Sequence, residues 1–180
     1  MSGKHVAKDQ PATFEFDANN QKRIQEILKK YPAERKKSAV MPLLDLAQRQ
    51  HDNWIPNAAI RKIGEILEVP YINVYEVATF YTMYNQKPIG KYMFEFCQTS
   101  CCCLNGAENL MDYTSEKLGI KMGETTPDGM FTIAGVECLG ACGYAPMMQL
   151  GDFYKEKLTE EKIDQIIADC RDDKIILHDK

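Results

Sequence analysis

The chain has 180 residues, of which 44% are hydrophobic and 27% are charged, as is ordinary for a globular protein. Its formal net charge of −4 argues against nucleic acid as a ligand, because phosphate groups require a clustered positive surface. No apolar run approaches the roughly 20 residues of a membrane helix, so we expect no direct membrane insertion.

The first part of the chain predicts a tail followed by helices. Residues 1–16 are polar and aperiodic, which indicates a mobile tail. Over residues 17–88, apolar side chains recur at helical spacing in four short segments, which predicts a small helical bundle domain. The expected helices begin near Asp17 or Asn19, after Ser38, near Asn57, and at Asn73, which can cap a helix with Glu76 three residues on.

The pattern changes at residues 85–90, where turn-forming residues cluster, and we place the domain boundary at about residue 88. Over residues 89–180 the order of expected elements is strand, helix, strand, strand, helix, which is that of an α/β sandwich. The expected strands are 92–96, 130–136 and 146–150, and the expected helices are 107–118 and one that Thr159 caps. The predicted fold class is therefore α/β (α+β), with a helical bundle before an α/β domain.

Six of the seven cysteines lie in two short segments, 97–103 and 138–142. An odd number of cysteines in a reducing compartment favours metal over disulfides. Cys97 and Cys102 have four residues between them, and Cys138 and Cys142 have three. Two iron ions bridged by two sulfides need two thiolates apiece, and these two pairs give that stoichiometry. The spacing therefore predicts an iron-sulfur site.

The remaining three cysteines have other roles in this interpretation. Three consecutive side chains cannot all face one metal, and we take Cys102 as the ligand because Cys101 or Cys103 would change the loop length. Those two are expected to be packed or partly exposed thiols. Cys170 lies on the apolar stripe of the last expected helix and is predicted to be a core residue.

Two other classes of protein stay open at this point. A set of four cysteines can also form a structural zinc site, although zinc ribbons use C-x2-C pairs that this chain lacks. A thiol-based redox protein would carry a C-x-x-C motif, and none occurs in the sequence.

The cysteine pattern, together with segment 137–147, closely resembles that of the thioredoxin-like 2Fe-2S ferredoxins. Segments 74–85 and 123–128 also resemble the family of small 2Fe-2S subunits in the NADH dehydrogenase module of respiratory complex I. The resemblance covers roughly residues 20–172 and implies a thioredoxin-like fold over residues 89–180. It implies one 2Fe-2S cluster with four cysteine ligands: Cys97, Cys102, Cys138 and Cys142. The family usually has Pro or Ala where this chain has Cys101, which leaves that ligand set intact.

The cluster moves one electron at a time, whereas NADH gives up a hydride, so a flavin must divide the electron pair. The glycines form neither a dinucleotide-binding nor a phosphate-binding motif, so we expect FMN and NADH on a partner chain. The resemblance implies that this partner is the FMN- and NADH-binding flavoprotein subunit, within a proton-translocating NADH:quinone oxidoreductase that includes other peripheral-arm subunits. Single electrons would pass between the cluster and that FMN, with no catalytic residue in this chain.

The resemblance leaves several alternatives. Soluble NAD-linked hydrogenases and formate dehydrogenases carry a related subunit. The implied location is the cytoplasmic side of a bacterial inner membrane, as a peripheral-arm subunit, or the matrix side of the mitochondrial inner membrane. Tyr81, Met83 and Tyr84 are expected either to fill an interface between the two domains or to dock the flavoprotein.

Overall fold

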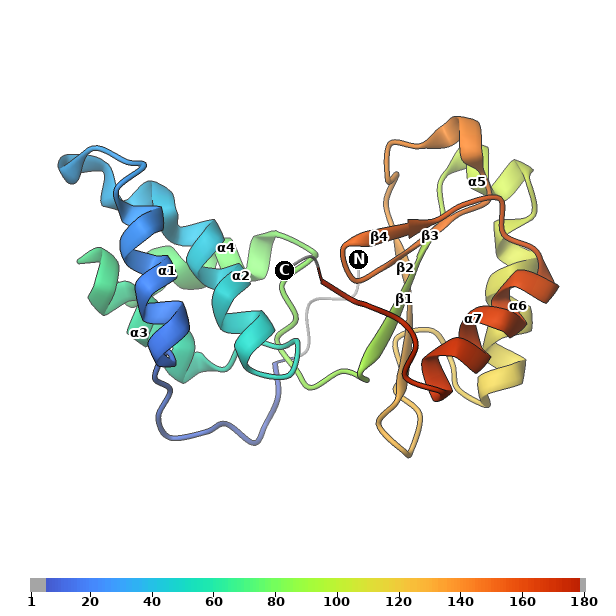
Figure 1. The fold of residues 1–180 in the computed structure, drawn as a ribbon, viewed down its shortest axis with the longest axis horizontal. Coiled ribbons are helices and arrows are strands. Elements are labelled where there is room, and N and C mark those ends of the chain that lie inside the picture. Colours follow the sequence, from blue (N-terminus) through green and yellow to red (C-terminus); the bar gives the residue numbers. More distant parts are fainter. Residues whose placement is uncertain (1–5, 179–180) are drawn as a thin grey trace. The chain divides into compact units, whose positions relative to one another are not determined.

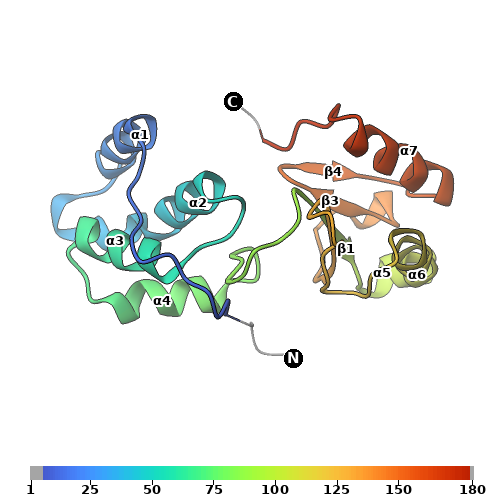
Figure 2. The same cartoon turned by 90° about the horizontal axis from the view of Figure 1, so that it is seen from below.

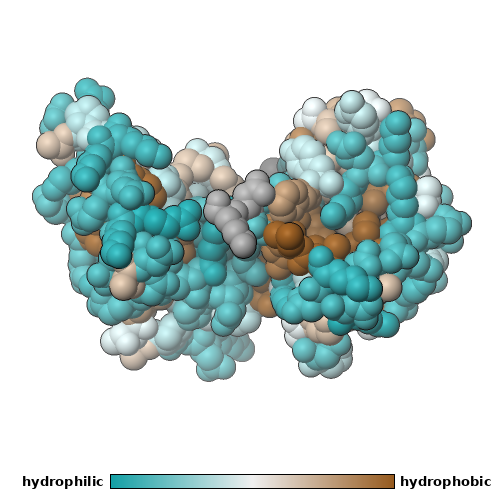
Figure 3. All heavy atoms as spheres, viewed as in Figure 1, coloured by the Kyte–Doolittle hydropathy of each residue, from teal (hydrophilic) through white to brown (hydrophobic). Residues whose placement is uncertain are grey.

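The computed structural model describes residues 6–178, and the chain forms two compact units, one ending at Pro88 and one beginning at Ile89 (Figure 1). Within residues 6–178 the first unit contains helices, and the second combines helices with a sheet. The predicted fold class is therefore confirmed. None of the helices in this range is long and apolar enough to cross a membrane. On the face shown in Figure 3, hydrophilic residues cover most of the surface of each unit.

The helical unit follows the apolar periodicity of its sequence. Asp17 caps the first helix by accepting a hydrogen bond from the Asn20 N–H at 2.7 Å. The helix expected to start at Asn73 starts instead at Tyr71, directly after Pro70, because the fixed φ of proline suits the entry to a helix. The elements are α1 (Ala18–Leu28), the 3-10 helix η1 (Ala33–Ala39), α2 (Val40–Gln50), α3 (Asn57–Leu67) and α4 (Tyr71–Phe80).

The core of this unit lies where α2 contacts α3 and both contact α4 (Figure 2). Its fully buried side chains include Leu43, Leu44, Ile60, Ile63 and Val74. Tyr84 also belongs to this core, since it is 3% exposed and its hydroxyl donates to the Met41 carbonyl at 3.0 Å. The expectation that Tyr84 lines an interface is therefore wrong.

The segment before α1 differs from the mobile tail expected over residues 1–16. Phe14 and Phe16 are 9% and 3% exposed and pack edge to face, with ring centroids 5.0 Å apart. The Gln50 amide donates to the Glu15 carbonyl at 2.8 Å, and Lys62 pairs with the Glu15 carboxylate at 2.7 Å. Phe14 and Phe16 are thus part of the helical core, while residues 1–5 lie outside the described range.

The second unit is built on a sheet with strand order β2-β1-β3-β4. Its strands are β1 (Tyr92–Cys97), β2 (Phe131–Val136), β3 (Met148–Leu150) and β4 (Phe153–Lys155), of which β4 was not expected from the sequence. β2 is parallel to β1, whereas β3 is antiparallel to both β1 and β4. Its helices are α5 (Ser100–Leu104), α6 (Ala107–Leu118), the 3-10 helix η2 (Cys142–Tyr144) and α7 (Glu160–Arg171).

Alternate residues of β1 build the core of this unit. Tyr92, Phe94 and Phe96 share one face of the strand and are at most 1% exposed. That face packs against α6 and α7, which lie side by side in Figure 1. Cys170 of α7 is 1% exposed in the same cluster, as predicted. Thr159 caps α7, also as predicted, by accepting from the Lys162 N–H at 3.3 Å.

Candidate metal centre

The parallel pairing of β1 and β2 brings two cysteine-bearing loops to one edge of the sheet. Cys97, the last residue of β1, lies in register with Val136, the last residue of β2. The Gln98 N–H then donates to the Val136 carbonyl at 3.0 Å, so the loops leave the sheet together. Cys138 lies two residues after the end of β2, and the loop that carries it therefore starts beside Cys97.

The first cysteine pair is buried. Cys97 and Cys102 are 2% and 1% exposed, and they form a small cluster with Ala107 and Met147. The Cys97 N–H donates to the Met147 carbonyl at 3.2 Å. Short helix α5 turns Cys102 back toward Cys97, so the two predicted partners meet against the core.

Hydrogen bonds and burial have opposite effects on the pKa of Cys97, whereas burial and the Cys97 sulfur act together on Cys102. Burial raises the pKa of the Cys97 thiol, but hydrogen bonds from Thr99 and from the Leu139 backbone bring it below its ordinary value. Burial, followed by the neighbouring Cys97 sulfur, raises the pKa of Cys102 to about 11. Cys97 is therefore the more acidic thiol of the pair.

The second cysteine pair is exposed. The Sγ atoms of Cys138 and Cys142 lie 3.6 Å apart. Gly140 between them has φ +80°, a left-handed conformation that glycine adopts without strain, and its N–H donates to the Cys138 Sγ at 3.4 Å. The Tyr154 hydroxyl donates to the Leu139 carbonyl at 2.7 Å and ties this loop to β4.

This pair also combines one lowered and one raised pKa. The Gly140 N–H, followed by the Cys142 thiol, lowers the pKa of Cys138. The Cys138 thiol, followed by Cys101, raises the pKa of Cys142 to about 11. In each pair one sulfur thus loses its proton more readily than the other, and a bound cation replaces the protons when thiolates become metal ligands.

The two pairs come close to each other through the loops between them. The Leu139 backbone, from the second loop, helps to lower the pKa of Cys97. The Thr99 hydroxyl lies 3.2 Å from the Cys97 Sγ and helps to lower the pKa of Cys138. Within residues 6–178, no three His, Cys, Asp or Glu side chains are grouped as ligands of a single ion. A two-iron cluster needs only two thiolates per iron, and the donor set of two thiol pairs fits that requirement.

The triplet at 101–103 is divided by burial. Cys102 is buried, whereas Cys101 is exposed and Cys103 is half-buried. Thr99 was not singled out in the sequence, although its place between two closely spaced cysteines is a signal that could have identified it.

The model of the family described as "Thioredoxin-like [2Fe-2S] ferredoxin" matches residues 24–171. The chain belongs to this ferredoxin family. Membership implies an iron-sulfur cluster as the bound group of this ferredoxin, and the two thiol pairs are the donor set that fits it.

Curated relatives of this ferredoxin carry a more specific name. The E subunit of the NADH-quinone oxidoreductase of Rickettsia felis is 49% identical over 160 residues, covering 89% of this chain and 96% of the relative. The protein of the same name from Rickettsia bellii is 50% identical over 160 residues, with the same coverage of both chains.

A solved structure extends the likeness in fold. A chain of an NAD+-reducing [NiFe]-hydrogenase superposes with a TM-score of 0.65 at 19% sequence identity, over 75% of this ferredoxin. The match spans 23% of the hydrogenase chain. At 19% sequence identity the superposition shows a shared fold alone.

Proposed function

We propose that this chain is the small electron-transfer subunit of an NADH-quinone oxidoreductase and binds one [2Fe-2S] cluster. The observation that carries the proposal is the meeting of two thiol pairs at one edge of the sheet, one pair buried and the other exposed. It is supported by two relatives that are named as the E subunit of that enzyme, 49% and 50% identical along most of their length.

In this proposal Cys97 and Cys102 hold one iron, and Cys138 and Cys142 hold the other. The bound cluster supplies one-electron redox chemistry. The protein encloses the first pair among apolar side chains, which excludes water from that side. Around the second pair it offers the Gly140 N–H as a hydrogen-bond donor to sulfur, and such donors help to set a cluster's reduction potential.

We further propose that the electron donor is the FMN of a partner flavoprotein subunit, which also binds NADH. The exposure of Cys138 and Cys142 supports this, because a partner must come close to the cluster to exchange electrons with it. We place the chain with other peripheral-arm subunits on the cytoplasmic side of a bacterial inner membrane. The bacterial origin of the relatives supports this location.

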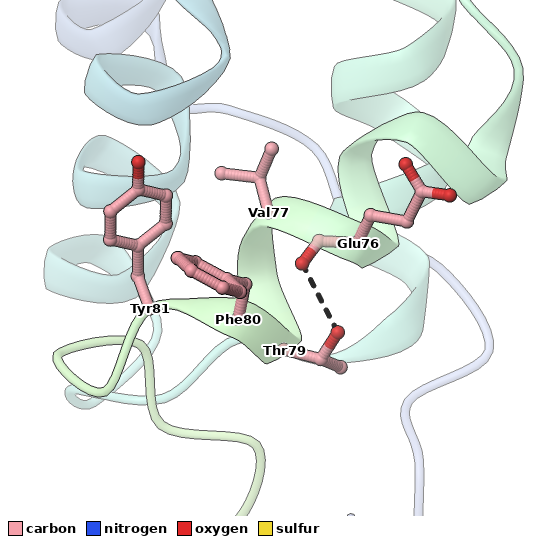
Figure 4. A pocket seen from close by; sticks show the side chains of 5 residues that line it. All are labelled: Glu76, Val77, Thr79, Phe80 and Tyr81. Atoms are coloured by element: carbon pink, nitrogen blue, oxygen red, sulfur yellow. Dashed lines mark hydrogen bonds between the residues drawn. The ribbon is translucent and has the colours of Figure 1, made fainter.

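An apolar patch at the end of α4 is our candidate for contact with the flavoprotein. It consists of Phe80, Tyr81 and Met83, which are 78%, 37% and 46% exposed. Figure 4 shows Phe80 and Tyr81 beside the shallow depression that they line with Glu76, Val77 and Thr79. Aromatic and methionine side chains are enriched at the centres of protein interfaces, which supports a docking role.

A second candidate is the equivalent subunit of an NAD-linked hydrogenase. The superposition on the NAD+-reducing [NiFe]-hydrogenase favours it, but a sequence identity of 19% supports only a common fold. The relatives at 49% and 50% identity make a subunit of NADH-quinone oxidoreductase the better proposal.

An absorption spectrum of the purified full chain tests the proposed cofactor. We expect a brown protein with visible charge-transfer bands that bleach on reduction with dithionite, and two iron atoms per chain, the number in a [2Fe-2S] cluster. A colourless protein with one zinc ion per chain would contradict the proposal and favour a zinc-stabilised module. A colourless, metal-free protein with a reducible disulfide would favour a thiol-based redox protein.

A further inference from the structure

Thr99 occupies the cap position of helix α5 but does not use its side chain as a cap. Its backbone has the extended conformation of a cap residue, with φ −104° and ψ 167°, and its carbonyl accepts from the Cys103 N–H at 3.0 Å. Among the described residues, no backbone N–H of α5 donates to the Thr99 hydroxyl. A threonine at this position normally accepts such a bond, so another group holds this hydroxyl.

The hydroxyl is directed at sulfur instead. Its Oγ1 lies 3.2 Å from the Cys97 Sγ, and the same hydroxyl helps to lower the pKa of the Cys138 thiol. Cys97 and Cys138 belong to different pairs, so Thr99 lies where the buried and the exposed halves of the site meet. Thr99 is itself half-buried, which limits competition from water.

The direction of the hydrogen bond with Cys97 follows from the chemistry of the groups. A hydroxyl has one hydrogen to donate, whereas a thiolate can only accept. When Cys97 is a metal-bound thiolate, Thr99 must therefore be the donor to its sulfur. A hydrogen bond to an ionised acceptor is stronger than one between neutral groups and strengthens as the acceptor gains negative charge.

We propose that Thr99 is a positioning residue whose hydroxyl donates to the Cys97 sulfur, where the two pairs meet, and raises the reduction potential of the cluster. This rests on the proposed function, in which Cys97 and Cys138 are ligands. On reduction the electron donor loses one electron and the iron-sulfur group gains it, while the hydroxyl proton stays on Thr99. The added charge spreads onto the sulfurs, so the hydrogen bond stabilises the reduced state more than the oxidised state.

The neighbouring residue offers a matched control. Ser100 is exposed and carries a hydroxyl on the same turn, yet within the described residues no hydrogen bond involves its side chain. Removing this hydroxyl changes the composition of the loop without removing a donor to sulfur. The Gly140 N–H that donates to Cys138 is a backbone group and stays in place in every variant.

The experiment is a redox titration of the full chain with its cluster, followed by electron paramagnetic resonance. Thr99→Val keeps the shape of the side chain without the hydroxyl, Thr99→Ser keeps the hydroxyl, and Ser100→Ala is the control. We expect a more negative midpoint potential for Thr99→Val, and potentials near that of the unsubstituted chain for Thr99→Ser and Ser100→Ala. Iron content and the visible spectrum report whether each variant holds a complete cluster.

Several outcomes would overturn the proposal. One is an unchanged potential in a Thr99→Val variant with a complete cluster, and another is an equal shift in Ser100→Ala. If Thr99→Val holds no cluster while Thr99→Ser does, the hydroxyl is needed for assembly, and the tuning role is wrong. If the unsubstituted chain itself shows no iron-sulfur spectrum, the proposed function fails and this proposal with it, a result distinct from an unchanged potential.

Discussion

Cys97 ends β1 in parallel register with Val136 at the end of β2. The carboxyl ends of parallel strands meet at one edge of a sheet. This register therefore brings together the two cysteine-bearing loops, although 35 residues separate Cys102 from Cys138 in the sequence. The core side chains Tyr92 and Phe94 of β1 keep that register in place, since a shift by one residue would turn them out of the core. The geometry of the candidate site is therefore a consequence of sheet packing.

The cysteine triplet permits a sharp test of the ligand assignment. We expect Cys102→Ser to lose most of the electron paramagnetic resonance signal of the reduced cluster, because Cys102 is buried beside Cys97. Cys103→Ser is the matched control, since Cys103 is the adjacent residue and only half-buried, and it should keep the signal. A full signal in Cys102→Ser, or its loss in Cys103→Ser, would show that the ligand is another member of the triplet.

The loop between Cys138 and Cys142 contains a glycine whose substitution should disturb the site, and a second glycine follows directly after Cys142. Gly140→Ala forces alanine into φ +80°, which costs about 1 kcal/mol and moves the N–H that donates to the Cys138 sulfur. We expect faster loss of iron to a chelator and a more negative potential. Gly143→Ala is the control, because Gly143 lacks a positive φ and a Cβ there meets no atom within 4 Å. Equal rates of iron loss in both variants would contradict a role for Gly140.

Local patterns in the sequence predicted most of the elements and the two cysteine pairs, because periodicity and spacing report what one segment does. They did not predict features that depend on distant segments. Phe14 and Phe16 lie in a polar stretch too short to show a period, and their burial depends on the helices that pack over them. The effect of Thr99 on the pKa of Cys138 likewise exists only once β1 and β2 have paired.

The segment before α1 should contribute to the stability of the helical unit. Phe16→Ala should lower the free energy of unfolding by about 3 kcal/mol, since Phe16 is 3% exposed in the core and truncation leaves a cavity. Phe80→Ala also removes a phenyl ring, but from a side chain that is 78% exposed. It should change the free energy of unfolding by less than about 0.5 kcal/mol. Urea unfolding of the full chain, followed by circular dichroism, measures both. A small effect for Phe16 would mean that residues 14–16 are a dispensable tail.

The patch at the end of α4 should matter for assembly rather than for stability. We expect Phe80→Ser to weaken co-purification with the flavoprotein subunit at least tenfold, because large aromatic side chains dominate interface energies. Ile72→Ser changes an apolar side chain that is 52% exposed at the other end of the same helix and outside the depression, and should leave binding unchanged. Undiminished binding by Phe80→Ser would exclude the patch as the docking surface.

Tyr84 should make the helical unit sensitive to alkaline pH. Burial, followed by the nearby Asp45 charge, raises the pKa of Tyr84 from 10.0 to about 12. Because the folded-state pKa is the higher one, the stabilisation is fully present below pH 10 and is lost as the pH rises toward 12. Tyr84→Phe removes both this titration and the hydrogen bond to Met41. We expect the substitution to lower the free energy of unfolding by about 1 kcal/mol at pH 8. Between pH 9 and 11 the variant should lose less stability than the unsubstituted chain. Urea unfolding at those three pH values measures the difference, and parallel losses in both proteins would assign the alkaline sensitivity to other groups.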